Sequence, residues 1–177
     1  MTKRTPPVRI ALSPITRADG PRLFRWINDR DLVLFSAAYH PVHEKSHVEW
    51  MRSLKDREDA VAFAIRLKRG KKLIGICQLT GISRVHRSAD LQIRIGYERS
   101  RGRGLGREAV RLLVDFAFRD LNLHRVSLQV FRTNARAIRA YEQAGFVREG
   151  TLREAAHVDG RYVDVLVMAV LRDETTG

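Results

Sequence analysis

The chain has 177 residues, 44% of them hydrophobic, which is enough to bury the core of a single domain over residues 1–177. Its 33 basic and 20 acidic side chains give a formal net charge of +13, which favours polyanions as partners: a phosphorylated cofactor, a nucleotide-linked substrate or nucleic acid. No apolar run approaches the roughly 20 residues that span a bilayer, residues 1–7 read as a flexible end without a signal peptide, and the single cysteine excludes an intramolecular disulfide, so we expect a cytoplasmic protein.

The first half of the chain predicts two helices and a hairpin. Thr16 and Asp19 provide capping signals for the first helix, and apolar residues recur at helical spacing in the second. Cys77 lies in the apolar pattern of the hairpin, where we expect a buried and inert thiol. In chain order we expect a strand at 8–12, a helix ending near 27, a loop at 32–43, a helix at 44–54, and strands at 61–67 and 73–79 joined by a turn at 69–70.

A glycine-rich segment at 101–106 lies between a stretch with strand periodicity and a stretch with helix periodicity. Leu91, Ile93 and Ile95 alternate with polar residues before it, as in a strand, and apolar residues recur at helical spacing from 105 to 116 after it. The segment is therefore a turn between a strand and a helix N-terminus, where backbone N–H groups and the helix dipole attract anions. Because the turn also contains two arginines suited to phosphate oxygens, it predicts a pyrophosphate site.

Two standard phosphate-binding loops do not fit this turn. A P-loop needs a longer glycine spacing followed by Lys and Ser or Thr, but Arg107 and Glu108 follow here. The dinucleotide fingerprint needs G-x-G-x-x-G, whereas Gly102, Gly104 and Gly106 follow the pattern G-x-G-x-G. The pattern that fits is R-x-x-G-x-G, although a turn of Arg and Gly that binds nothing has the same composition.

The second half of the chain continues with a strand, a helix and a closing hairpin. Asn134 is a good N-cap for the helix and Gly145 is a good stop signal. The resulting element order is β-α-α-β-β-β-α-β-α-β-β. Strands are expected at 124–131, 146–156 and 162–171, the last two joined by a turn at 159–160.

The turn and the helix together resemble a known family. The R-x-x-G-x-G turn, followed by N-x-x-A-I-x-x-Y-E-x-x-G-F at 134–146, resembles the two motif blocks of the GNAT superfamily of N-acetyltransferases. The resemblance is tight over 85–172 and loose over 8–84. It is nearest the branch of ribosomal-protein alanine and spermidine acetyltransferases, and the runs at 90–93 and 159–164 resemble the spermidine enzymes in particular.

The resemblance implies both a fold and an activity. The fold is α/β (α+β), the GNAT fold: a central mixed, mostly antiparallel sheet of about six or seven strands, flanked by about four helices and splayed between the fourth and fifth strands. The activity is direct transfer of an acetyl group from acetyl-CoA, as cosubstrate, to a primary amine, with no metal. Such a transfer needs a neutral amine, a hydrogen-bond donor to the tetrahedral oxyanion and an acid for the leaving thiolate.

The resemblance also implies roles for single residues. Tyr141 stands where the family carries a Tyr near the CoA sulfur and would protonate the thiolate, with plain packing beneath the cofactor as the alternative. Asp90, where the spermidine enzymes carry Glu, is the first candidate base; Glu98, Glu149 and a chain of waters are alternatives. The oxyanion donor would be a backbone N–H between Ile93 and Ile95. The implied cofactor-binding residues are Ile93, Arg94, Ile95, Arg101, Gly102, Arg103, Gly104, Leu105, Gly106, Arg107, Asn134, Ala137 and Tyr141.

Two histidines in the second predicted helix have a spacing seen in metal sites. His43 and His47 are four residues apart and so share a helix face. Because no further ligands converge on them in the sequence, exposed or capping roles are favoured and no metal is expected.

Three classes of acceptor amine remain open. A small-molecule or nucleotide-sugar amine ranks first, because the many arginines suit a diphosphate. The N-terminus of a ribosomal protein ranks second, since a basic enzyme can dock on ribosomal RNA. A polyamine ranks third: the tail at 159–164 favours it, but residues 32–43 contain no carboxylate and the positive net charge repels a polycation.

A protein of another class, a nucleic-acid-binding module that keeps the fold without catalysis, also fits the positive charge. Against it, aromatic residues make up 7% of the chain and do not interleave with the basic residues as stacking platforms do. A solvated arginine-rich surface explains the charge equally well. The final hairpin leaves a sheet edge that allows a homodimer, and no membrane contact is expected.

Overall fold

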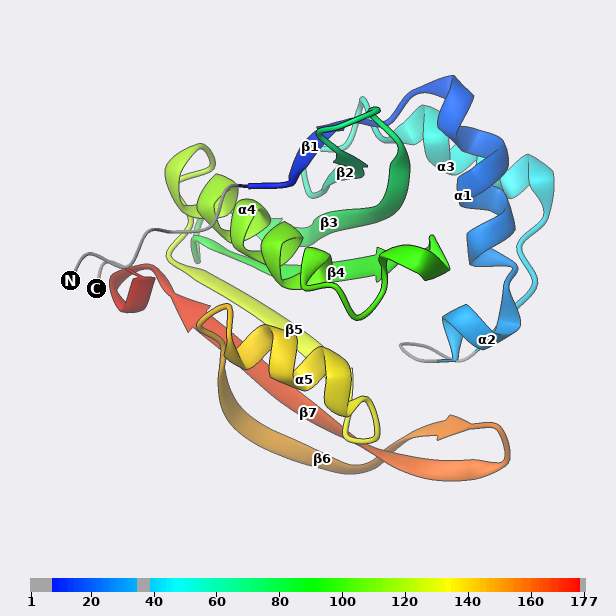
Figure 1. Ribbon diagram of the computed structural model, residues 1–177. Coiled ribbons are helices and arrows are strands. Elements are labelled where there is room, and N and C mark those ends of the chain that lie inside the picture. Colours follow the sequence, from blue (N-terminus) through cyan, green and yellow to red (C-terminus); the bar gives the residue numbers. More distant parts are fainter. Residues whose placement is uncertain (1–7, 35–38, 176–177) are drawn as a thin grey trace.

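The computed structural model describes residues 8–34 and 39–175, so the segment 1–7, predicted to be flexible, lies outside the described residues. Within these residues, seven strands form one sheet in the order β1-β2-β3-β4-β5-β7-β6 (Figure 1). The strands are β1 (Ile10–Pro14), β2 (Val61–Leu67), β3 (Leu73–Ser83), β4 (Ser88–Ile95), β5 (Arg125–Phe131), β6 (Val147–Val158) and β7 (Arg161–Leu171). The helices are α1 (Gly20–Ile27), α2 (Arg30–Val33), α3 (Glu44–Ser53), α4 (Leu105–Arg119) and α5 (Ala135–Glu142).

The sheet is split between β4 and β5. These two strands pair in parallel through Ser88–Asp90 and Arg125–Ser127, and beyond Asp90 they diverge (Figure 1). The other neighbouring strands pair antiparallel. The splay expected between the fourth and fifth strands is therefore confirmed. It leaves the β5-facing edge of β4, from Leu91 onward, without a strand partner in the described part of the chain.

Helices pack on both faces of the sheet. On one face α4 lies against β1, β3 and β4, and α5 lies over β5 and β7 (Figure 1). Phe63 of β2 points to this face and meets Phe116 of α4 edge to face, with ring centroids 5.0 Å apart. Its neighbour Ala64 joins Leu23 and Trp26 of α1 in a second buried cluster. Since adjacent strand residues point to opposite faces, the two clusters lie on opposite sides of the sheet.

The predicted elements occur in the predicted order, but the structure adds the helix α2, which was not predicted, and several boundaries differ. The short helix α2 occupies the start of the predicted loop 32–43, because the Asp29 side chain accepts a hydrogen bond of 3.1 Å from the backbone N–H of Leu32. β3 continues past the predicted end at 79, since Ser83 still pairs with β4. β1 begins two residues later than predicted and extends to Pro14, opposite Phe63 of β2. Residues 35–38 of the predicted loop lie outside the described residues.

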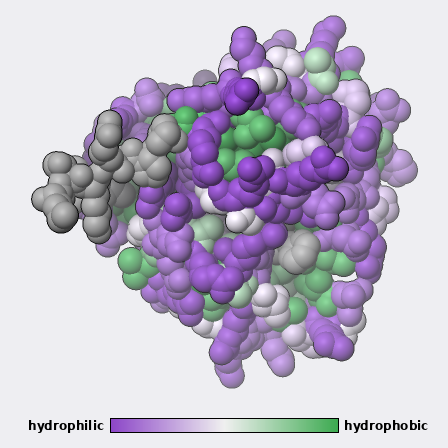
Figure 2. Space-filling model, viewed as in Figure 1, coloured by the Kyte–Doolittle hydropathy of each residue, from purple (hydrophilic) through white to green (hydrophobic). Residues whose placement is uncertain are grey.

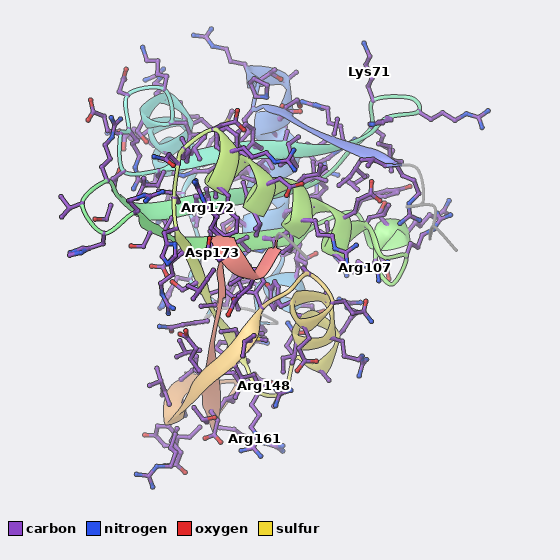
Figure 3. The ribbon with its side chains drawn as sticks, turned by 90° about the vertical axis from the view of Figure 1, so that its left-hand side faces the viewer. Lys71, Arg107, Arg148, Arg161, Arg172 and Asp173 are labelled. Carbon is purple, nitrogen blue, oxygen red and sulfur yellow. The ribbon has the colours of Figure 1, made fainter. Side chains whose placement is uncertain are left out.

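The surface is polar, and basic side chains lie on several of its elements. The face seen in Figure 2 is mostly hydrophilic, with small apolar patches between the polar side chains. Figure 3 shows four basic side chains on separate elements: Lys71 on the β2–β3 turn, Arg107 on α4, Arg148 on β6 and Arg161 on β7. Over the described ranges, no helix is both long and apolar enough to cross a membrane.

Candidate active site

Two cavities meet where β4 and β5 diverge. The first, of about 690 Å³, lies between helices α1 and α3 and the strands β3 and β4, and we name it the strand cavity. The second, of about 370 Å³, lies between the glycine-rich turn and α5, and we name it the turn cavity. Ile93, Arg94, Gln129 and Tyr141 line both of them. The splay of the sheet thus joins two binding spaces at one point.

The glycine-rich turn has the backbone geometry of an anion site. Gly104 is the N-cap of α4 and adopts a left-handed conformation with φ of 76°, and Gly102 has φ of 73°. Residues with a side chain rarely adopt this conformation, so the turn requires glycine at both positions. The first N–H groups of a helix have no intrahelical partner. Here that helix end lies beside the turn cavity, where an anion can accept from those groups.

Two arginines of the turn region make structural hydrogen bonds. Arg101 donates from Nε to the carbonyl of Ile95 at 3.1 Å and from Nη2 to the carbonyl of Gly96 at 3.0 Å, which ties the turn to the end of β4. Arg107 donates to Oε1 of Gln143 at 2.8 Å and so joins α4 to α5. The sequence predicted Arg101 as a phosphate ligand; in the structure its guanidinium already serves two backbone carbonyls.

Most of the predicted cofactor-binding residues converge on the turn cavity. The exceptions are Arg103, which lines neither cavity, and Leu105, which is buried in the core. Sequence reasoning missed Arg136, Arg139 and Gln143 of the α5 region, which also line this cavity. The first two are three residues apart and share a helix face, and that spacing was a signal available in the sequence.

The helix α5 presents a tyrosine to both cavities. Asn134 caps this helix, because its Oδ1 accepts a hydrogen bond of 3.1 Å from the backbone N–H of Ala137, as predicted from the sequence. Tyr141 lies on the last turn of α5, is 8% exposed and packs on Phe146. Burial raises the pKa of Tyr141 to about 12. The phenol therefore keeps its proton at neutral pH and can act as a proton donor.

The strand cavity is lined by apolar and neutral polar side chains with few charges. Trp26, Trp50 and Gln78 are typical members. Among the described residues that line it, Asp90 is the one carboxylate and Arg94 is the one guanidinium. The cavity is therefore not a pocket lined with acids.

Of the three predicted base candidates, Asp90 is the one that lines a cavity in the described structure. Its Oδ1 accepts a hydrogen bond of 2.6 Å from the Ser127 hydroxyl. Glu149 is held by Arg125 through hydrogen bonds of 2.7 and 2.5 Å, and this guanidinium lowers the pKa of Glu149. Glu98 is exposed, in the 3-10 turn Glu98–Ser100.

His47 and Cys77 are buried in the fold, and His43 is exposed on the surface. His47 is buried, and its Nε2 donates to the carbonyl of Gly20 at 3.1 Å, whereas His43 is exposed at the start of α3. No group of three metal-binding side chains occurs within residues 8–34 and 39–175. Cys77 is buried, and burial raises the pKa of its thiol to about 12, so it is not a nucleophile at neutral pH.

The sheet splay, the glycine-rich helix N-terminus and the second cavity together define an acetyltransferase of the GNAT fold. The family described as "Acetyltransferase (GNAT) domain" matches residues 9–147, and the chain belongs to this family. GNAT acetyltransferases use acetyl-CoA as cosubstrate, and the glycine-rich turn before α4 lines the turn cavity of this chain.

Relatives of known or assigned activity are N-acetyltransferases. The chain is 41% identical to spermidine N(1)-acetyltransferase of Vibrio cholerae over 104 residues, which are 59% of this chain and 60% of that protein. It is 30% identical over 105 residues to YdaF of Bacillus subtilis, named as a candidate ribosomal N-acetyltransferase, covering 59% of this chain and 57% of that protein. These aligned segments thus span less than two thirds of each relative's length.

A solved structure is similar over nearly the whole chain. The spermidine N-acetyltransferase of V. cholerae, in complex with CoA and spermine, superimposes with a TM-score of 0.86 at 30% identity. The alignment covers 94% of this chain and 97% of that chain. The resemblance inferred from the two sequence motifs is therefore confirmed for the family, the fold and the branch.

Proposed function

We propose that this protein transfers the acetyl group of acetyl-CoA directly to a primary amine of a small molecule, without a covalent enzyme intermediate. The observation that supports this most directly is the position of Tyr141, which lines both cavities. A proton donor at this point can serve a leaving group in the turn cavity while an amine attacks from the strand cavity.

The chain can hold the cosubstrate through its backbone. The N–H groups of the turn from Gly102 to Gly106 would bind the pyrophosphate, and Asn134 would contact the pantetheine arm. β4 has backbone N–H and C=O groups on its β5-facing edge from Leu91 to Ile95, where the strands have diverged. Unpaired strand groups need partners, so this edge would pair with the pantetheine amides.

Each step of the transfer has a candidate group. When bound, acetyl-CoA supplies the activated acyl carbon and a thiolate leaving group. Asp90, directly or through water, would take a proton from the attacking ammonium group. A backbone N–H between Ile93 and Ile95 would donate to the oxyanion as the new C–N bond forms. Tyr141 would give its proton to the sulfur as the C–S bond breaks.

A polyamine is the second candidate acceptor. The likeness to spermidine N-acetyltransferases supports it, and Asp90 offers one carboxylate to a polycation. A protein N-terminus, ranked second from the sequence, becomes the third candidate, and a homodimer stays a prediction. The nucleic-acid module is less favoured, because aromatic residues make up 7% of the chain and do not interleave with the basic residues as stacking platforms do.

The test measures binding first and turnover second. Isothermal titration calorimetry with acetyl-CoA should give saturable binding, and a thermal shift should show a stabilisation of about 2.7 kcal/mol at about 100 times Kd. Release of the CoA thiol is then followed with a panel of primary amines. Normal binding with amine-dependent thiol release supports the proposal. Absence of any shift with acetyl-CoA, together with salt-dependent binding of oligonucleotides, would overturn it in favour of the nucleic-acid module.

A further inference from the structure

Arg94, which the sequence predicted as a cofactor-binding residue, lines both cavities, and the proposed reaction does not use its guanidinium. Gln92, two residues earlier on the same face of β4, lines the strand cavity. Arg94 pairs across the sheet with Ile76, which lines the strand cavity. Side chains of paired residues lie on the same face, so the guanidinium points to the strand cavity, where the amine would bind.

The guanidinium lies there without an acidic partner. Its Nε is buried and has no hydrogen-bond partner among the described residues. Burial lowers the pKa of Arg94, and no acidic side chain offsets that effect. The nearest carboxylate on its own strand face is Asp90, four residues away and so about 13 Å along β4. That carboxylate is exposed and already accepts from Ser127. Arg94 as a whole is half-buried and stays charged, so its Nε–H is a donor removed from water that an incoming acceptor group can satisfy.

In the proposed binding mode, acetyl-CoA brings no negative charge to the Arg94 guanidinium. Its charged groups are phosphates, for which the chain offers the helix N-terminus at Gly104 in the other cavity. The portion expected beside β4 is the pantetheine arm, which carries no charge. A counter-ion for Arg94 therefore has to arrive with the acceptor.

We propose that Arg94 binds an anionic group of the acceptor, a carboxylate or a phosphate, so that the preferred acceptor is a primary amine that carries a negative charge. The inference rests on the proposed acetyl transfer and narrows its substrate class. The planar guanidinium matches a carboxylate or a phosphate with two parallel hydrogen bonds. The same charge disfavours spermidine, which brings only cations to the cavity.

The test compares three small primary amines that differ in charge, with spermidine as the longer polycationic acceptor. Propylamine is neutral beyond its amine, β-alanine adds a carboxylate, phosphoethanolamine adds a phosphate, and spermidine adds cations. Values of kcat and KM come from CoA thiol release for the unmodified protein, for Arg94→Met and Arg94→Lys, and for Arg119→Met. Arg119 is an exposed residue at the end of α4 that lines neither cavity, so this variant controls for loss of one positive charge.

The unmodified protein and Arg119→Met should prefer the two anionic amines over propylamine. Arg94→Met should lower kcat/KM for the anionic amines about 10- to 100-fold, mainly through KM, and leave propylamine nearly unchanged. Arg94→Lys should retain part of the preference for anionic amines over propylamine, because lysine keeps the positive charge but not the planar guanidinium. A higher kcat/KM for β-alanine would indicate a carboxylate in the preferred acceptor, and a higher kcat/KM for phosphoethanolamine would indicate a phosphate. Acetyl-CoA binding by calorimetry checks that each variant is folded.

Two results would overturn the inference while leaving the acetyl transfer intact. One is a preference for spermidine or propylamine that Arg94→Met does not change. The other is an equal loss of kcat for every amine, which would place Arg94 at the oxyanion instead of at the acceptor's anionic group. If no amine releases thiol and acetyl-CoA does not bind, the proposed function itself fails.

Discussion

Ser127 donates a hydrogen bond of 2.6 Å from its hydroxyl to Oδ1 of Asp90. The two residues face each other at the last paired position of β4 and β5, immediately before the strands diverge. The contact therefore fixes the carboxylate at the closed end of the splay, on the lining of the strand cavity. Asp90 is therefore our candidate base for an incoming amine.

We predict that Asp90→Asn lowers kcat/KM for the acceptor about 100-fold, because general-base assistance contributes on that scale. Ser127→Ala should cause a smaller loss, since it frees the carboxylate without removing it. Glu149→Gln is the matched control, because Glu149 lines neither cavity and is held by Arg125. Steady-state thiol release checks all three. Unchanged kinetics of Asp90→Asn at saturating acetyl-CoA would assign deprotonation to water.

Tyr141→Phe should lower kcat about 100-fold while the Kd for acetyl-CoA stays within about twofold, because only the proton donor is removed. The raised pKa of Tyr141, about 12, adds a pH prediction. The phenol keeps its proton between about pH 7 and about pH 10, so the kcat of the unmodified protein should show no loss from this group in that window. If Tyr141→Phe has the same kcat as the unmodified protein, Tyr141 is not the proton donor and its ring only packs beneath the cofactor.

The sequence predicted the elements better than it predicted the contacts of charged residues. Periodicity and the capping residue Asn134 located α5, because both signals are local. The N-terminus of α2 is capped by one hydrogen bond, which the Asp29 side chain accepts from the backbone N–H of Leu32, and loop conformations of similar energy compete with it. Whether Arg101 binds a phosphate or a carbonyl depends on the distance between strand and turn, and sequence spacing does not contain that distance. The exposure of Arg94 to both cavities likewise arises from the splay.

Gly104→Ala should abolish measurable acetyl-CoA binding, whereas Gly70→Ala should not affect it. Both glycines have φ of 76°, so both substitutions strain the backbone by about 1 kcal/mol. Gly70 lies in the β2–β3 turn, where an added Cβ meets no atom within 4 Å. The pair thus separates backbone strain from loss of the anion site. Titration calorimetry measures binding and urea denaturation measures stability; normal affinity in Gly104→Ala would contradict the site at this turn.

Asp19 and Arg66 form a partly buried ion pair, with Nη2 at 2.8 and 2.6 Å from the two carboxylate oxygens. Burial raises the pKa of Asp19, but hydrogen bonds from Arg66 and Thr16 outweigh it, and the net pKa lies below the ordinary 3.8. A lowered folded pKa stabilises the protein above the unfolded value, and this stability is lost as the pH falls through the folded value.

We therefore predict that Asp19→Asn costs about 3 kcal/mol near pH 7 and that its difference from the parent disappears progressively below about pH 4. Asp59→Asn is the control, because its pair with Arg57 is exposed and screened by solvent, so its loss should change stability little at any pH. Urea denaturation across a pH series measures both. A cost for Asp19→Asn that stays constant down to pH 2 would contradict the role of the charge.

The thiol of Cys77 should react with an aromatic disulfide reagent only as fast as the protein opens. Cys77 is 1% exposed, and burial raises its pKa to about 12, so neither access nor thiolate is available in the folded state. Labelling should therefore accelerate with urea in parallel with unfolding. Saturating acetyl-CoA, at about 100 times Kd, should slow it about 100-fold, because ligand binding lowers the open population by that factor. Fast labelling in native buffer would show that the strand holding Cys77 opens locally, and an unchanged rate with acetyl-CoA would show that this opening is independent of the turn cavity.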